Sequence, residues 1–340
     1  MTSAVSKPWY RRPSRMIPLG FLAAGVIVAV VGALTPWPAA LLIRALFEKG
    51  AAESVAKMVP YVPDTVDARL DIPYANGGSD TTFDLFRPEG VTGALPTVVW
   101  IHGGAWISGD KQNVDPYARI LASHGYTTVS LNYTVSPETT YPTALTQLND
   151  ALRYLVANAE ELGIDSDQIV IAGDSAGANL TSQLAVLTTN KEYAALVGIE
   201  PALSPDLLSA VILNCGIYDV SGIPNAPGIG GWGFRIALWA YLGEKDWSRT
   251  PGGQEMSTLD YVTEDFPTTW ISGGNGDPLT PAQSKPLADK LTGLGVDVTP
   301  VFYPDDLEPA LPHEYQFELN TAPAQDALES TLAFLAKVTG

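Results

Sequence analysis

A serine flanked by glycines stands where an apolar run gives way to a helical pattern. Residues 173–177 read GDSAG, between the run 169–172 (IVIA) and a helical pattern over 175–188. Glycine on both sides lets the serine backbone enter a strained turn, because a Cβ at either glycine would collide with the neighbouring strand or helix. The turn holds the Ser175 hydroxyl above the strand ends, beside a helix N-terminus whose dipole favours a developing anion. These residues predict a nucleophile for acyl transfer.

A serine nucleophile needs a base and an acid, and later segments supply both. Asp277 lies in the loop 272–278 (SGGNGDP), just beyond a predicted strand, and His313 lies between the last predicted strand and the last helix. Active-site residues of open parallel sheets gather beyond the strand ends. We therefore expect His313 to take the Ser175 proton, and Asp277 to fix the imidazole tautomer.

Other titratable residues compete for these roles. Asp305 and Asp306 are alternative acids, but they belong to the loop just before His313. Glu314 is expected to be a solvated neighbour of the histidine. His102 is interpreted as a hydrogen bonder that holds its own loop, because its position ahead of two glycines directs it away from Ser175.

A second glycine-rich loop is expected to bind the oxyanion. Residues 102–106 read HGGAW and follow the β-branched run 96–101. Two glycines let the main chain approach a ligand and direct its N–H groups into the site. The N–H groups of Gly103 and Gly104, together with that of Ala176, are the predicted oxyanion donors.

The elements that must position these loops alternate between strands and helices. Buried or half-buried strand patterns and amphipathic helical patterns follow one another from about residue 71 to the C-terminus, which predicts one mostly parallel sheet with helices on both faces. The predicted strands are 82–87, 96–101, 127–131, 169–172, 211–213, 269–271 and 296–302. The predicted helices are 116–123, 141–162, 175–188, 282–294 and 324–338.

An insertion rich in glycine and aromatic residues separates two of these strands. It runs from about 219 to 265, a place where lids and caps are added to such sheets, and it carries Trp232 and Trp239. We expect both indoles, together with that of Trp106 at the end of the glycine loop, to contact substrate. The open alternative is that they form the aromatic core of a small helical cap.

The N-terminal segment has the composition of a membrane anchor. Residues 16–34 carry no charge, and nineteen helical residues span about 28 Å, close to the bilayer hydrocarbon core. Four basic residues precede them, which favours a cytoplasmic N-terminus and an extracytoplasmic body. We expect a basic tail and anchor over 1–47, a linker or short amphipathic helix over 48–70 and the catalytic domain over 71–340. Cleavage as a signal peptide, giving a secreted protein, is the alternative.

Composition excludes several other functions. Residues 1–47 hold five of the 19 basic residues and no acidic one, so the body is more acidic than the net charge of −18. An acidic body repels phosphate backbones, so we expect no nucleic-acid partner. Cys215, the single cysteine, is expected to be a buried core residue. The three histidines form no cluster at metal-ligand spacing, so we expect neither a metal nor a cofactor.

Three motifs together resemble the hormone-sensitive-lipase-like branch of the α/β-hydrolases. They are the loop 102–106 (HGGAW), the residues Tyr133, Pro137, Glu138, Tyr141 and Pro142, and the stretch 173–180 (GDSAGANL). The resemblance covers roughly residues 82–335 and implies an α/β-hydrolase fold that hydrolyses carboxylic esters without a cofactor. It also supports the roles given to Ser175, Asp277, His313, Gly103 and Gly104. Ala105 departs from the pattern, since it replaces the third glycine of the usual HGGG.

The expected function is therefore a serine esterase for esters of short to medium acyl length, acting on a small-molecule substrate through an acyl-enzyme. An amidase such as an arylformamidase and an envelope deacetylase are alternatives. A non-catalytic binding protein is a third, disfavoured because the chain keeps a full set of catalytic residues.

Overall fold

A single eight-stranded sheet forms the centre of the molecule. The structure is a computed structural model that describes residues 25, 30–223 and 228–340. The strands lie in the order β1-β2-β4-β3-β5-β6-β7-β8. They are β1 (Val66–Pro73), β2 (Thr82–Pro88), β3 (Leu95–Ile101), β4 (Thr127–Leu131), β5 (Ile164–Asp174), β6 (Leu208–Asn214), β7 (Thr268–Gly273) and β8 (Val298–Phe302). β2 runs antiparallel to both of its neighbours and the remaining pairs are parallel, so the predicted mostly parallel sheet is confirmed.

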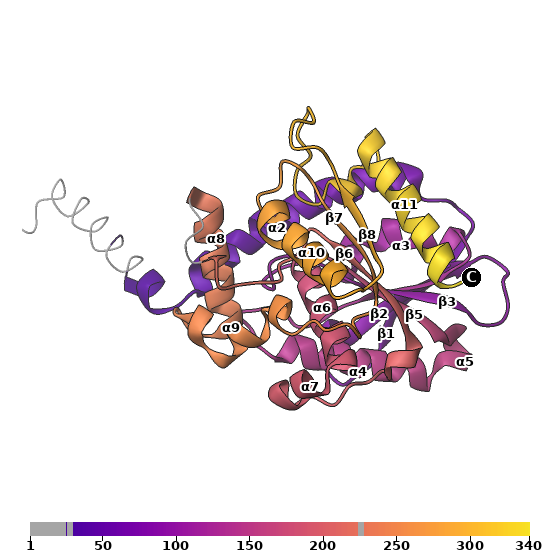
Figure 1. The fold of residues 1–340 in the computed structure, drawn as a ribbon, viewed down its shortest axis with the longest axis horizontal. Helices are drawn as coiled ribbons and strands as arrows, with labels where there is room; N and C mark the ends of the chain where they lie inside the picture. The colour runs from indigo at the N-terminus through magenta and orange to yellow at the C-terminus, as the bar shows by residue number, and fades with distance from the viewer. Residues whose placement is uncertain (1–24, 26–29, 224–227) are drawn as a thin grey trace, which may run out of the picture.

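Helices cover both faces of this sheet, and alternate residues of each central strand face opposite cores. Val99 and Ile101 of β3 pack into the larger core, whereas Val98 and Trp100 pack into the second one. In Figure 1, α11 lies above the sheet and α4 below it. The helices are α2 (Trp37–Met58), α3 (Asp115–Ser123), α4 (Thr143–Ala157), α5 (Ala159–Leu162), α6 (Ala176–Thr189), α7 (Lys191–Val197), α8 (Gly228–Leu242), α9 (Pro251–Glu255), α10 (Lys285–Gly293) and α11 (Ala322–Val338).

The predicted helix over 141–162 is divided in two. α4 ends at Ala157. The side-chain amide of the next residue, Asn158, donates to the Tyr154 carbonyl at 2.8 Å, and α5 follows. An asparagine amide that bonds to a nearby carbonyl competes with continued helix formation. The helical periodicity was therefore sufficient to find both pieces, but it did not reveal the break.

Residues 48–70, predicted to be a linker or a short amphipathic helix, are mostly helix and strand packed on the body. α2 begins at Trp37 within the predicted anchor region and runs to Met58, and the edge strand β1 begins at Val66. Arg44 fixes α2 through bonds to the Ile107 carbonyl at 2.6 Å and to Glu138 at 2.6 Å. The sequence did not reveal this packing because the contacts that hold α2 are long-range. The hydrogen-bond acceptors of Arg44 lie more than sixty residues away along the chain.

The predicted membrane span over residues 16–34 lies mostly outside the described residues. Within the described part of the chain, no helix combines the length and the apolar composition needed to cross a bilayer.

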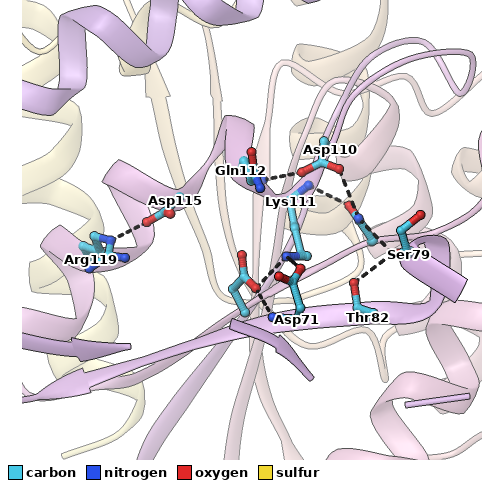
Figure 2. Close-up of polar contacts among 10 residues, drawn as sticks. Asp71, Ser79, Thr82, Asp110, Lys111, Gln112, Asp115 and Arg119 are labelled. Carbon is cyan, nitrogen blue, oxygen red and sulfur yellow. Dashed lines mark hydrogen bonds and ion pairs between the residues drawn. The ribbon is translucent and has the colours of Figure 1, made fainter. Parts of the chain in front are cut away.

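A buried ion pair connects the end of the glycine loop to the antiparallel edge of the sheet. Lys111 is 2% exposed, and its Nζ lies 2.5 Å from Asp84 Oδ1 and 2.7 Å from Asp71 Oδ1. Its backbone N–H donates to Asn132 Oδ1 at 2.7 Å. Figure 2 shows this lysine reaching toward Asp71 beneath Asp110. Lys111 therefore connects the segment after the glycine loop to both β1 and β2.

Replacing Lys111 with methionine is expected to lower the free energy of unfolding by about 3–5 kcal/mol, because it leaves the Asp84 carboxylate buried without its counter-ion. Urea unfolding of the purified variant measures the loss. Lys285→Met is the matched control: it breaks the exposed pair with Asp305 and should cost less than about 1 kcal/mol. An equal decrease in the free energy of unfolding in the two variants would show that the buried ion pair stabilises the fold no more than the exposed one.

Candidate active site

Ser175 occupies the sharp turn between β5 and α6. Its φ is +52° and its ψ is −117°, a combination that residues with a side chain rarely adopt. A Cβ on Gly173 would lie 2.5 Å from the Gly177 carbonyl oxygen, and a Cβ on Gly177 would lie 2.1 Å from that of Ile101. Both glycines are therefore required for close packing at this turn, for the reason the sequence indicated.

Asp277 and His313 form a close pair although 36 residues separate them. His313 Nδ1 lies 2.6 Å from Asp277 Oδ2, and the Asp277 side chain is 1% exposed. A carboxylate only accepts hydrogen bonds, so Nδ1 carries the proton and Nε2 is left with its lone pair when the ring is neutral. The alternative acid Asp305 is instead paired with Lys285 at the surface.

One cavity of about 430 Å³ brings these residues together beyond the carboxyl ends of the strands. Ser175, Asp277 and His313 all line it, as do Gly103 and Gly104 of the glycine loop. They follow β5, β7, β8 and β3, so the parallel sheet is what places them at one edge. The nucleophile, the base and main-chain amides predicted from the sequence thus share one chamber.

The glycine loop differs in detail from its predicted role. Gly103 N–H donates to Asp174 Oδ2 at 2.8 Å, so this group is already bonded inside the protein and is not a free oxyanion donor. Gly104 has φ +107°, and a Cβ there would lie 2.2 Å from the Ser108 carbonyl oxygen. In the described part of the chain, the N–H groups of Gly104, Ala105 and Ala176 have no internal acceptor. Gly104 and Ala105 line the cavity and Ala176 directly follows Ser175, so these three are the candidate donors for an oxyanion.

His102 holds the loop, as expected. Its Nδ1 lies 2.8 Å from the Gly103 carbonyl oxygen, and its ring stacks on Tyr133 with centroids 4.4 Å apart. Burial lowers the pKa of His102 below its usual value, so the ring is neutral at pH 7. It fills the space beside the loop and takes no part in the Asp277–His313 pair.

The three tryptophans predicted to contact substrate lie elsewhere. Trp106 is fully buried and stacks on Tyr241 at 5.4 Å, and Trp239 lies in the larger core. Trp232 is 42% exposed, and none of the three lines the cavity. The alternative reading of the insertion, an aromatic core, therefore describes Trp239 correctly.

The cavity takes its apolar walls from one residue of the aromatic-rich insertion and from three residues outside it. Phe234 of α8, Leu46 and Phe47 of α2, and Phe317 after β8 line it. Phe234 is one of the aromatic residues of the insertion that was expected to line the pocket, so the insertion contributes a wall through Phe234 and not through Trp232 or Trp239. Leu46 and Phe47 were missed because α2 was divided between the predicted anchor and linker.

Glu314 faces His313 and is not the solvated neighbour predicted from its position. Its Oε1 lies 3.7 Å from His313 Nε2, its backbone adopts φ +57°, and its N–H points at Cys215 Sγ, 3.4 Å away. Behind it, Asp174 Oδ1 accepts from Trp100 Nε1 at 2.7 Å. A second acidic cluster therefore adjoins the histidine, on the side opposite Asp277.

These charges determine the protonation of the site. Burial alone would lower the pKa of His313, but the hydrogen bond to Asp277 and the charge of Glu314 raise it to about 9. Burial and the neighbouring Glu314 raise the pKa of Asp174 well above its usual range. The raised pKa favours the protonated form of Asp174.

Cys215 is a buried residue, as predicted, and it lies beside the pair. Among the described residues, its Sγ forms one compact group of potential metal ligands with Asp277 and His313, all within 4.8 Å of one another. Burial raises the pKa of the thiol well above its usual value, which disfavours the thiolate that a metal requires. The group's geometry is explained by the Asp277–His313 hydrogen bond and the Glu314 N–H contact.

Comparison with known proteins finds a matching family model and relatives that are named as esterases. A family model described as BD-FAE matches residues 83–291, more than half of the chain. Esterase LipQ of Mycobacterium tuberculosis is 30% identical over 66% of this chain and 53% of its own length. The probable carboxylic ester hydrolase LipM of the same organism is 30% identical over 79% of this chain and 61% of its own length. The chain thus spans between half and two thirds of these curated relatives.

Solved structures agree on the fold. Esterase B from Lactobacillus Rhamnosis has a TM-score of 0.76 and 24% identity, covering 89% of this chain and 96% of that one. A bacterial heroin esterase has a TM-score of 0.67 and 24% identity, covering 87% and 91%. At this identity the likeness shows the fold, which is that of the α/β-hydrolases.

Proposed function

The chain belongs to the BD-FAE family, and on that premise we propose that it is a serine hydrolase that cleaves carboxylic esters. The observation that carries the proposal is the shared cavity: a serine in a strained turn, a histidine paired with a buried aspartate, and unpaired main-chain N–H groups line one chamber. The esterase and carboxylic ester hydrolase named among its relatives support the same reaction class.

In the first step, Ser175 Oγ attacks the ester carbonyl carbon while its proton passes to His313 Nε2. The carbonyl π electrons move to oxygen, and the resulting oxyanion is held by the N–H groups of Gly104, Ala105 and Ala176. Each such donor lowers the barrier by about 3 kcal/mol. Asp277 stabilises the imidazolium that forms. When the tetrahedral intermediate collapses, the alcohol leaves with the proton from Nε2, and the acyl group remains on Ser175.

In the second step, water replaces the alcohol. His313 takes a proton from water as its oxygen attacks the acyl carbon, and the same oxyanion donors act again. Collapse of this intermediate returns the proton to Ser175 Oγ and releases a carboxylic acid. No cofactor is needed for either step.

The test of this proposal is a side-by-side assay of the purified chain. We expect it to hydrolyse p-nitrophenyl esters of acetate, butyrate and octanoate and to leave aryl formamides unchanged. Hydrolysis of the formamides alone would overturn the ester assignment in favour of an amidase.

Phe234 is expected to limit the acyl chain. It lines the cavity from α8, whereas Trp232, two residues earlier on the same helix, does not. Phe234→Ala should shift the octanoate-to-butyrate ratio of kcat/KM by about tenfold, since a few methylenes in an apolar pocket have effects of this size. Trp232→Ala is the matched control and should leave the ratio unchanged; an equal shift in both variants would count against a wall formed by Phe234.

We also propose that residues 16–34 anchor the protein in the cell membrane as a single span, with the catalytic body on the extracytoplasmic side. The uncharged stretch and the four bases before it support this topology. Alkaline extraction combined with protease accessibility of intact cells tests it. Recovery of a soluble, N-terminally shortened chain would favour the secreted alternative.

A further inference from the structure

The outer face of α2 and the turn before it expose large apolar side chains. Leu34 is 76% exposed, Trp37 43%, Leu41 44% and Leu42 58%. We call these four residues the apolar face of α2. Soluble surfaces normally carry such side chains singly, and a contiguous group of them marks an interaction site.

The packing of α2 fixes this face outward. Ala40 and Ile43, on the opposite side of the helix, are buried against Ala105 and Ile107 of the glycine loop and against α8. Figure 1 shows α8 beside the N-terminal half of α2. Arg44 then clamps the helix to the body through the Ile107 carbonyl and Glu138. Rotation that would bury the apolar face would break all of these contacts.

The same helix also forms the mouth of the active-site cavity. Leu46 and Phe47, one turn beyond the apolar face, line the cavity and are 63% and 44% exposed. The character of the surface changes immediately afterwards: Lys49 and Glu53 are exposed and paired at 4.0 Å. The cavity mouth therefore lies at the border between an apolar surface and a charged one.

The chain that precedes α2 indicates what covers this face. Residues 16–34 are uncharged and follow four basic residues, so the apolar face continues a segment with the composition of a membrane span. We propose that the apolar face of α2 lies in the surface of a lipid bilayer, and that the cavity takes its esters from that surface as water-insoluble substrates. The inference rests on the proposed esterase function and adds the physical state of the substrate to it.

The experiment uses the full chain reconstituted in vesicles of diether phosphatidylcholine, which contain no hydrolysable lipid ester. Two butyrate esters are compared: tributyrin dissolved in the vesicles and soluble p-nitrophenyl butyrate. The variant is Leu41→Ser with Leu42→Ser, since neither residue lines the cavity. The matched control is Leu70→Ser with Leu196→Ser, two leucines with the same exposure of 53% on β1 and α7.

The Leu41/Leu42 variant should lose about tenfold in tributyrin hydrolysis while p-nitrophenyl butyrate hydrolysis stays unchanged, because weaker seating in the lipid surface affects only the dissolved substrate. The control variant should retain both rates. Unchanged tributyrin hydrolysis by the Leu41/Leu42 variant would overturn the inference, as would a detergent-free dimer of the full chain that buries this face. A full chain inert toward p-nitrophenyl butyrate in every form would instead refute the proposed function.

Discussion

Replacing Ser175 with alanine is expected to lower kcat for ester hydrolysis by about 10⁶-fold, because the variant has no oxygen to receive the acyl group. The fold should not change. Alanine retains the Cβ that the turn already accommodates at φ +52°, and it removes one oxygen from a cavity wall. Steady-state hydrolysis of p-nitrophenyl butyrate, with circular dichroism and urea unfolding of the same sample, measures both parts of the prediction.

The matched control is Ser221→Ala, which alters an exposed serine in the insertion after β6. Its rate should equal that of the natural chain. Residual activity of Ser175→Ala above one per cent would mean that another group carries the acyl transfer. Loss of folding in Ser175→Ala would leave its rate without meaning, and for that reason the unfolding curve belongs to the same experiment.

Replacing Asp277 with asparagine is expected to lower the maximal kcat/KM by about 10⁴-fold. The side chain keeps its size, but an amide Nδ2 can donate to His313 Nδ1 and so place the proton on Nε2, the nitrogen that must accept it from serine. The 2.6 Å contact makes His313 sensitive to this exchange. Asp305→Asn, which alters the surface ion pair with Lys285, is the control and should leave kcat/KM unchanged.

The pH profile provides the second signature of the same pair. The base form of His313 is required, and with its pKa at about 9 the value of kcat/KM should rise as pH increases and level off above about 9. Removing the negative charge in Asp277→Asn should move this limb to lower pH as well as reduce the plateau. Glu314→Gln should move the limb in the same direction with little loss of plateau, since Glu314 raises the pKa of His313 without bonding to Nδ1. A limb that stays in place in both variants would contradict the electrostatic description of the site.

Local sequence signals predicted most of the sheet and the identity of the central residues. β4 has the predicted bounds, and β3 and α3 begin one residue earlier than predicted. Buried parallel strands are continuous apolar runs, so their positions are visible in a window of a few residues. The need for glycine at positions 173 and 177 could likewise be predicted, because it results from local crowding at one turn.

Features that depend on distant partners could not be predicted in this way. Gly103 lost its predicted role because the acceptor of its N–H is Asp174, 71 residues later. Glu314 was predicted to be solvated, but its side chain lies near His313 Nε2. This position depends on a left-handed backbone conformation and on a contact with Cys215, 99 residues earlier, neither of which the local sequence reveals. α2 was divided between anchor and linker because its amphipathic pattern is weak and its fixed position comes from Arg44.

The most direct measurement is to treat the protein with a fluorophosphonate and to locate the adduct by mass spectrometry of its peptides. A stoichiometric phosphonate on Ser175, formed faster at pH 9 than at pH 6 and absent from His313→Ala, is the predicted result. An adduct on any other residue, or an unmodified Ser175 in a protein that still hydrolyses p-nitrophenyl butyrate, would contradict it.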